Sequence, residues 1–227
     1  QISTLSKRVK TLSGRMGLLN VRNQRNSMTF SVLRSKILMF NFAVAMTAGK
    51  VLNLVKAYGA QERAEKAVES ALKSTGGAAG LSAMEINRLA VSIQKATGVG
   101  DELVLESSAL LATFTQVGEK TFPQAQQAIV DATAAMYQGH ITGEALKTTT
   151  LQVGKALNDP IKGMTALQRV GVKFTYEQKK QIQYFVHTNQ MAKAQSIILK
   201  ELQKEFGGMG KAIRQTTEGR LVALNSA

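Results

Sequence analysis

The chain has 227 residues, 44% of them hydrophobic, with 19 Gly, 2 Pro and no Cys or Trp. The hydrophobic content excludes a disordered tail, and the lack of Cys excludes a disulfide framework, a thiolate metal site and a cysteine nucleophile. The formal net charge is +14, and residues 1–60 contain ten Lys or Arg but no acidic residue. This N-terminal basic segment (residues 1–60) is therefore suited to an anionic environment.

The N-terminal basic segment is predicted to form one long helix with a coiled-coil seam. From residue 2 to residue 58, positions that alternate by three and four residues are apolar at fourteen of seventeen places, which is the period of a coiled coil. Asn23 and Asn26 would form polar layers that set the register. The expected seam consists of Ile2, Leu5, Val9, Leu12, Met16, Leu19, Asn23, Asn26, Phe30, Leu33, Ile37 and Phe40. The same spacing continues through Val44, Thr47, Val51, Leu54 and Tyr58.

Basic residues flank this seam on one side and are predicted to contact a polyanion: Arg8, Arg15, Arg22, Lys36 and Lys50. No acidic residue of the segment can pair with them, so neighbouring copies would repel each other unless anions surround them. Three interpretations stay open. The helix packs on its own domain, it associates with copies of itself in an anionic environment, or it binds nucleic acid or membrane directly.

Residues 61–122 are predicted to contain three short helices separated by glycines. A helix over residues 61–73 leads into the glycine-rich stretch 74–80, which we expect to be a hinge. Ser82 and Glu85 have the spacing of a capping box, which predicts a helix start. Its expected inner face is Ile86, Leu89, Ala90 and Ile93. The next helix is expected to bury Leu103, Leu110, Phe114 and Val117.

The helices of residues 123–212 are predicted mainly from their end signals. Pro123 suits a first turn, and Gly139 is expected to end that helix, whose inner face would be Ala125, Ala128, Ile129, Ala132 and Met136. A helix over residues 143–158 follows. The stretch around Asp159 then holds boundary signals in order: Asp159 and Pro160 start a helix, Gly171 ends it, and Thr175 with Gln178 forms a second capping box. Asn189 is expected to cap the last strong helix, which Gly207 and Gly208 stop and whose inner face is Met191, Ala194, Ile198, Leu202 and Phe206.

No residue pattern in the chain indicates catalysis, a cofactor or a metal. The sequence GGMGKA at 207–212 resembles the end of a phosphate loop, but the first glycine, the Ser or Thr after Lys211, and the preceding strand are all absent. His140 falls in a predicted turn and His187 near a helix end, where a cation is favourable. The carboxylate pairs Asp101–Glu102 and Glu102–Glu106 resemble an ordinary helix start, where acidic residues are favourable. We therefore expect a protein that is not an enzyme.

Four stretches in combination resemble the helical module of tape measure proteins from long-tailed bacteriophages and prophages. They are ATGVGDELVLESSALLATF, AIVDATAAMYQG, LQVGKALNDPIKGMTALQRVGVKFTYEQKKQI and AQSIILKELQKEFGGMG. The resemblance covers residues 81–212. Members of this family are longer than this chain, so we expect the chain to be one portion of such a protein.

The resemblance implies a structural virion protein in the lumen of the tail and near its tip. It implies that the protein sets tail length during tube assembly and leaves ahead of the DNA to help genome delivery. The implied partners are further copies of the chain, as in a trimer, the tail tube, the tail-tip or distal tail proteins, tail assembly chaperones, phage DNA and the host envelope membrane. The protein would lie in the host cytoplasm during assembly and reach the host envelope on infection. The five flanking basic residues would then contact the tube wall or DNA.

The expected fold is all-α, with the long heptad-patterned helix followed by short amphipathic helices joined by Gly and Pro turns. We expect a basic coiled-coil-like helix over residues 1–60, a helix and hinge over 61–80, the tape-measure-like module over 81–212, and the start of a further helical segment over 213–227. Two alternative functions remain. One is a basic helical protein that binds nucleic acid, and the other is a membrane-active, pore-forming helical protein that acts through residues 37–55, where hydrophobicity is highest.

Overall fold

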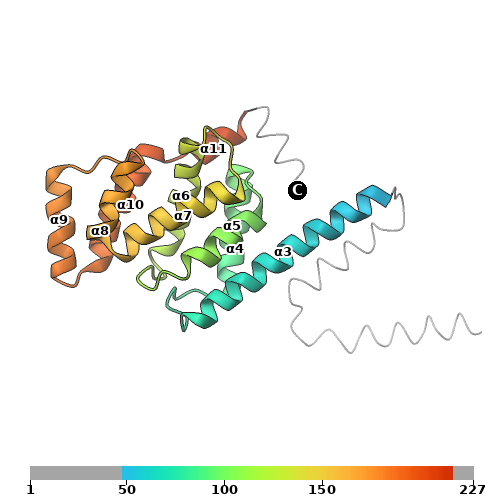
Figure 1. The fold of residues 1–227 in the computed structure, drawn as a ribbon, viewed down its shortest axis with the longest axis horizontal. Helices are drawn as coiled ribbons and strands as arrows, with labels where there is room; N and C mark the ends of the chain where they lie inside the picture. Colours follow the sequence, from blue (N-terminus) through green and yellow to red (C-terminus); the bar gives the residue numbers. More distant parts are fainter. Residues whose placement is uncertain (1–47, 217–227) are drawn as a thin grey trace, which may run out of the picture. The chain divides into compact units, whose positions relative to one another are not determined.

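The described part of the chain is all-helical. A computed structural model describes residues 48–216, with side chains from residue 58 onward, and this part contains no strand (Figure 1). The contacts divide the chain into residues 1–55 and residues 56–227. The predicted heptad helix lies outside the described residues as far as residue 47. Helix α3 (Ala48–Ser74) then runs without interruption through residue 60, where the sequence suggested that one segment ends and another begins.

Helices α4 to α11 follow α3 in order: α4 (Ala83–Thr97), α5 (Asp101–Leu111), α6 (Phe122–Met136), α7 (Gly143–Asn158), α8 (Pro160–Arg169), α9 (Tyr176–His187), α10 (Met191–Phe206) and α11 (Met209–Arg214). Helix α6 is the centre of this arrangement, because it contacts α5, α7, α10 and α11. Ten of its fifteen residues are buried. Its many alanines let four neighbouring helices approach closely around it.

The helix starts predicted at Ser82, Asp159 and Thr175 are confirmed. Ser82 forms the capping box with Glu85, and Thr175 forms the second one with Gln178. The Asp159 side chain accepts the Lys162 N–H at 3.2 Å, directly before Pro160 at the start of α8. The stretch around Asp159 is therefore a joint between α7 and α8. Each cap satisfies an N–H that the first turn of a helix leaves without an intrahelical partner.

Asn189 does not cap the last strong helix, which is a correction to the prediction. Its φ of 56° is left-handed, and it follows Thr188 at the end of α9. The next amide, Gln190 N–H, donates to Phe185 O at 2.7 Å, so the turn closes α9. Asn suits a helix start and a left-handed helix end equally well, because its short amide can bond nearby backbone in both. The N-cap of α10 is Gln190.

The predicted inner face of α5 is partly wrong. Leu103 and Leu110 are only half-buried, whereas Val104, Leu105 and Leu111 are fully buried. The helix contacts α4, α6 and α7, so it is covered on several sides and buries more than one stripe. It ends at Leu111, so Phe114 and Val117 lie in the following turn. Their expected burial is confirmed there, because Val117 is fully buried and Phe114 packs against the core.

The glycine-rich stretch 74–80 is packed against the core only near its end, and four of its seven residues are exposed. Ala79 is only 1% exposed. A Cβ on Gly80, whose φ is +69°, would lie 3.0 Å from Glu119 Cβ. Ala79 therefore ties the end of the stretch to the core, whereas a Cβ on Gly76 or Gly77 would meet no atom within 4 Å.

Candidate functional site

The site residues predicted from the sequence lie outside the described side chains. This applies to every seam position from Ile2 to Phe40 and to Arg8, Arg15, Arg22 and Lys36. Lys50 belongs to α3, but its side chain is not among those described. Their roles remain predictions. The described residues offer two other surface features, a pocket beside α11 and the surface around α9.

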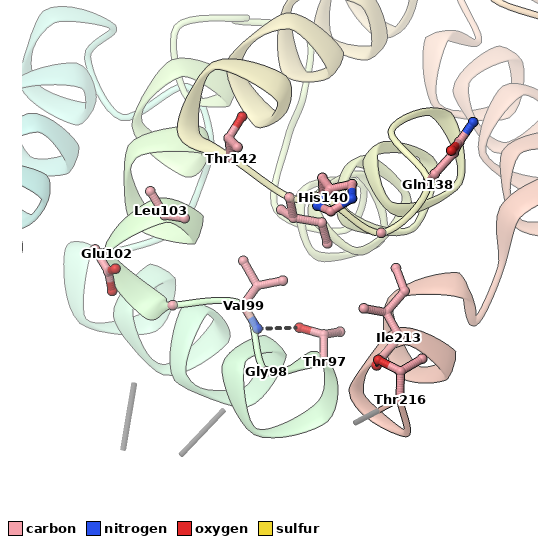
Figure 2. Close-up of a pocket in the computed structure, with 13 residues that line it drawn as sticks. Thr97, Gly98, Val99, Glu102, Leu103, Gln138, His140, Thr142, Ile213 and Thr216 are labelled. Atoms are coloured by element: carbon pink, nitrogen blue, oxygen red, sulfur yellow. Dashed lines mark hydrogen bonds between the residues drawn. The ribbon is translucent and has the colours of Figure 1, made fainter. Parts of the chain in front are cut away.

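The pocket has a volume of about 520 Å³ and lies where the α4–α5 turn, the α6–α7 turn and α11 meet (Figure 2). Its apolar lining consists of Val99, Leu103, Ile141 and Ile213, and its polar lining includes Glu102, Gln138, His140 and Thr142. Figure 2 shows Val99 on the α4–α5 turn and His140 on the α6–α7 turn, with Ile213 and Thr216 on the α11 side. The lining is mixed in character, as in many small-molecule and peptide sites.

Two left-handed glycines shape the turns that line this pocket. Gly98 ends α4 with a φ of 80°, and its N–H donates to Gln94 O at 2.8 Å. Gly139 ends α6 with a φ of 91°, and its N–H donates to Ala134 O at 2.8 Å. Glycine adopts this conformation without steric cost, so both helices stop sharply at the edge of the pocket.

A buried carboxylate holds α11 as the third wall of the pocket. Asp131, in the centre of α6, accepts the Gly210 N–H at 3.0 Å on Oδ1 and the Gln127 Nε2–H at 3.2 Å on Oδ2. A Cβ on Gly210 would lie 3.0 Å from Thr97 Cγ2 and 3.1 Å from Asp131 Oδ1. Gly210, the third glycine of the GGMGKA stretch, therefore permits close contact of α11 with α4 and α6. This pair was not predicted from the sequence, although an Asp within an alanine-rich helix and a Gly within a helix are both visible signals.

Replacing Asp131 with Ala is expected to loosen α11 while the rest of the module stays folded. The change removes a buried hydrogen bond to a charged acceptor, which is worth about 2 kcal/mol. We expect the amides of residues 209–214 to exchange with solvent deuterium about 30-fold faster. Glu69→Ala on the exposed surface of α3 is the matched control and should leave this exchange unchanged. Equal protection of α11 in Asp131→Ala and in the wild type would contradict the anchoring role.

The described residues contain no group of three His, Cys, Asp or Glu that could hold a metal ion. One cluster of hydroxyl groups is structural: Ser107 and Thr150 are bonded at 2.8 Å, and Gln126 Nε2–H donates to Ser107 Oγ at 2.9 Å. All three side chains are buried and join α5, α6 and α7. They lie away from solvent, where each of these hydrogen bonds offsets part of the cost of burying a polar group. Gln126 Oε1 is buried there without a hydrogen-bond partner.

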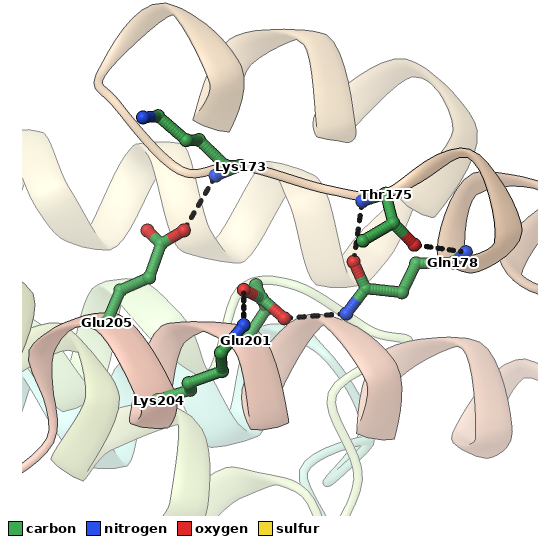
Figure 3. Close-up of polar contacts among 6 residues, drawn as sticks. All are labelled: Lys173, Thr175, Gln178, Glu201, Lys204 and Glu205. Carbon is green, nitrogen blue, oxygen red and sulfur yellow. Dashed lines mark hydrogen bonds and ion pairs between the residues drawn. The ribbon is translucent and has the colours of Figure 1, made fainter.

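The second feature is the polar network that fixes α9 on α10 (Figure 3). Gln178 Nε2–H donates to Glu201 Oε2 at 2.6 Å, and Lys204 Nζ–H donates to Glu201 Oε1 at 3.1 Å. These bonds stabilise the carboxylate, so Gln178 first and then Lys204 hold the pKa of Glu201 below its ordinary value. One helical turn further along α10, Glu205 Oε1 accepts the backbone N–H of Lys173 at 2.7 Å. The network orients α9 so that its opposite side faces solvent.

A comparison with protein families identifies the chain. The family model for the prophage tail length tape measure protein matches residues 16–183, which is about three quarters of the chain. The chain belongs to the prophage tail length tape measure protein family. No curated protein and no solved structure matches it.

The tape measure match covers residues 16–60 of the N-terminal basic segment and most of the folded module. It begins within the predicted coiled coil, extends through α3 to α8 and ends inside α9. The match therefore confirms the family resemblance over residues 81–183, and the resembling stretch AQSIILKELQKEFGGMG lies beyond the matched residues. Tape measure proteins are structural components of the phage tail, which agrees with the expectation that this chain is not an enzyme. Among the helices described, none is long and apolar enough to cross a membrane.

Proposed function

We propose that this chain is a portion of the ruler that sets tail length from inside the tail tube and near its tip. The observation that supports this role is the tape measure family match over residues 16–183. In this proposal the N-terminal basic segment measures length, and the module of α4 to α11 is a compact element of the same protein. During infection the protein leaves ahead of the DNA and assists genome delivery.

A ruler needs extended structure whose length follows the number of residues. An α-helix rises about 1.5 Å per residue, so the expected helix over residues 2–58 would span about 85 Å. Helix α3 continues the helical backbone from residue 48 to residue 74. The heptad seam would let copies associate, as in a trimer, so that the measured element is a stiff coiled coil.

The charge of the N-terminal basic segment supports two proposed partners, the tube wall and the DNA. Arg8, Arg15, Arg22, Lys36 and Lys50 have no acidic residue within residues 1–60. In the proposal they contact the tube wall or the DNA behind it, since an anionic surrounding removes the repulsion between copies. The tail-tip proteins, the assembly chaperones and the host envelope membrane are further proposed partners.

An in-frame duplication of residues 2–57, eight whole heptads, should lengthen the tail by about 84 Å, which is 1.5 Å for each of the 56 added residues. Negative-stain electron microscopy of the parent virion measures this length directly. The expected result is a uniform shift of the whole length distribution.

A flexible Gly-Ser insertion of 56 residues at the same place is the matched control. It adds the same number of residues without a helix, so its effect should depart from 1.5 Å per residue. Normal tails of unchanged length after the duplication would show that residues 2–57 are not part of the ruler. Tail-tip docking or DNA passage would then be the better explanation of this segment.

A further inference from the structure

The folded module has a strongly uneven charge distribution. Residues 61–168 contain nine basic and eleven acidic residues, whereas residues 169–216 contain nine basic and only three acidic residues. The net charge summed over all residues after residue 60 does not reveal this difference between the two parts. A second basic region therefore exists, built from α9, α10, α11 and the loop before α9, and separate in sequence from the N-terminal basic segment.

The acidic residues of this region are mostly turned toward the protein. Glu201 is buried and bonded to Gln178 and Lys204, and Glu205 accepts the Lys173 backbone N–H. Glu177 is the exposed acidic residue that remains. Within residues 58–216, Lys204 is the one basic residue of this region that forms an ion pair. The surface thus presents cations whose charge the protein does not neutralise.

Helix α9 presents aromatic rings among these cations. Ile182 is its fully buried residue, and the packed side includes Gln178, Phe185 and Val186. The opposite side forms one stripe, because its residues follow the helical period. We call it the α9 stripe: Tyr176, Lys180, Gln183, Tyr184 and His187. All five are exposed.

The two tyrosines of the α9 stripe are unusually open, with exposed fractions of 66% for Tyr176 and 61% for Tyr184. They lie eight residues apart, which is about 12 Å along the helix axis. Lys180 Nζ lies 4.5 Å from the centre of the Tyr176 ring, so a cation and an aromatic face act at one point. In Figure 1, α9 is the outermost helix of this end of the module, beyond α8 and α10.

We propose that the α9 stripe binds single-stranded nucleic acid. The lysines around it would neutralise phosphates, and the rings of Tyr176 and Tyr184 would stack on unpaired bases. This is the combination by which single strands are bound without sequence preference, a basic track with aromatic platforms. This binding should be measurable with the isolated protein in solution. It does not require that the protein set tail length.

Other occupants fit the α9 stripe less well. A second copy of the chain would bring the same positive charge to the contact. An acidic protein surface would pair with the lysines, and polyglutamate in the test below measures this alternative. A duplex offers phosphates, yet its bases are paired and stacked inside the helix, which leaves the tyrosines without a partner for their rings. Unpaired bases use both groups.

The test uses the full chain, which contains no Trp and four Tyr. In the variant Tyr58→Phe/Tyr137→Phe, only Tyr176 and Tyr184 emit, so their fluorescence reports this site even when the N-terminal basic segment also binds. Titration with a 20-nucleotide oligo(dT) in 0.2 M salt should quench the emission. The same concentration of a 20-base-pair duplex or of polyglutamate should quench it much less.

Charge variants define the electrostatic part. Lys179→Gln/Lys180→Gln/Lys193→Gln should weaken the quenching and lower the salt slope by about 0.7 for each phosphate that the variant no longer neutralises. The matched control removes three exposed lysines elsewhere in the module, Lys95→Gln/Lys147→Gln/Lys155→Gln. It should leave the midpoint of the oligo(dT) titration unchanged. All of these side chains lie on the surface or near it, so melting temperatures should stay close to that of the parent.

Ring variants separate stacking from hydroxyl bonding. These variants are made in a chain whose ten Lys and Arg of residues 1–60 are replaced by Gln, so that labelled oligo(dT) does not report the N-terminal basic segment. In that chain Tyr176→Phe/Tyr184→Phe should bind within about twofold of the parent, whereas Tyr176→Leu/Tyr184→Leu should bind at least about tenfold more weakly. Three results would overturn the proposal: no quenching by oligo(dT), equal quenching by duplex or polyglutamate, or an equal loss of affinity in the Phe and Leu variants. The last result would indicate phosphate binding by the tyrosine hydroxyl groups.

Discussion

Gly163→Ala is expected to lower the free energy of unfolding by about 3 kcal/mol, near the upper end for overpacked cores. Helix α8 folds directly back on α7, and at Gly163 it reaches the backbone of Ala156. A Cβ at this position would lie 2.8 Å from both the N and the Cβ of Ala156 and still closer to its Cα. Backbone atoms cannot move aside as the end of a side chain can.

The short joint between the two helices makes this clash hard to relieve. Helix α7 ends at Asn158 and α8 begins at Pro160, so the helices cannot separate without moving the whole of α8. That movement would expose Met164 and Leu167, which are 5% and 1% exposed. The clash and the exposure of apolar side chains therefore act together.

Thermal unfolding of Gly163→Ala should show a midpoint lower by about 6–12 °C, as expected for 3 kcal/mol in a domain of this size. Gly118→Ala is the matched control, because a Cβ there meets no atom within 4 Å. It should change the free energy of unfolding by less than about 0.5 kcal/mol. Equal midpoints for the two variants would show that α7 and α8 are not closely packed in solution.

Gln195→Leu is expected to cost about 2–4 kcal/mol of stability, because one buried amide serves three partners from distant parts of the chain. Its Nε2 group donates to Gln116 O at 2.6 Å and to Leu157 O at 3.0 Å, and its Oε1 accepts the Thr121 hydroxyl at 3.1 Å. Leu157 O is in the last turn of α7, where carbonyls have no intrahelical partner. Leucine would remove all three bonds and leave the Leu157 carbonyl, whose bond is buried, without its partner.

Urea unfolding of Gln195→Leu measures this destabilisation, with Gln203→Leu as the control on the exposed side of the same helix. The control should stay within about 0.5 kcal/mol of the wild type. Gln195→Glu adds a second comparison, because a carboxylate keeps the shape but cannot donate to the two carbonyls. It should destabilise the fold at least as much as Gln195→Leu, and a stable Gln195→Glu variant would contradict this role of the amide.

The helix boundaries of the module could be predicted because their causes are local. The capping bonds of Ser82, Asp159 and Thr175 each reach only three residues ahead. The left-handed glycines that end α4, α6 and α8 are equally local. Such signals depend on neighbours within one turn of helix, so they can be recognised in the sequence alone. Asn189 shows the limit, since a residue with two local uses needs the surrounding helices to decide between them.

The contacts that close the module could not be predicted, because they join residues far apart in the chain. Gly210 and its partner Asp131 are 79 positions apart, and so are Gln195 and Gln116. Nothing in the residue order says which helices meet at these points. The same reason explains the error in α5, whose buried side depends on α4, α6 and α7 lying around it.

By itself, the sequence determined the family, the helical class, most helix ends and the charge of the N-terminal basic segment, since all of these depend on composition or on near neighbours. Only the tertiary structure decided the packing of the stretch 74–80, the anchoring of α11 by Asp131, and the solvent-facing stripe of α9. Tyr176 and Tyr184 have the same local surroundings whether they are buried or exposed. Which side of a helix meets water is decided by the helices that pack against its other side.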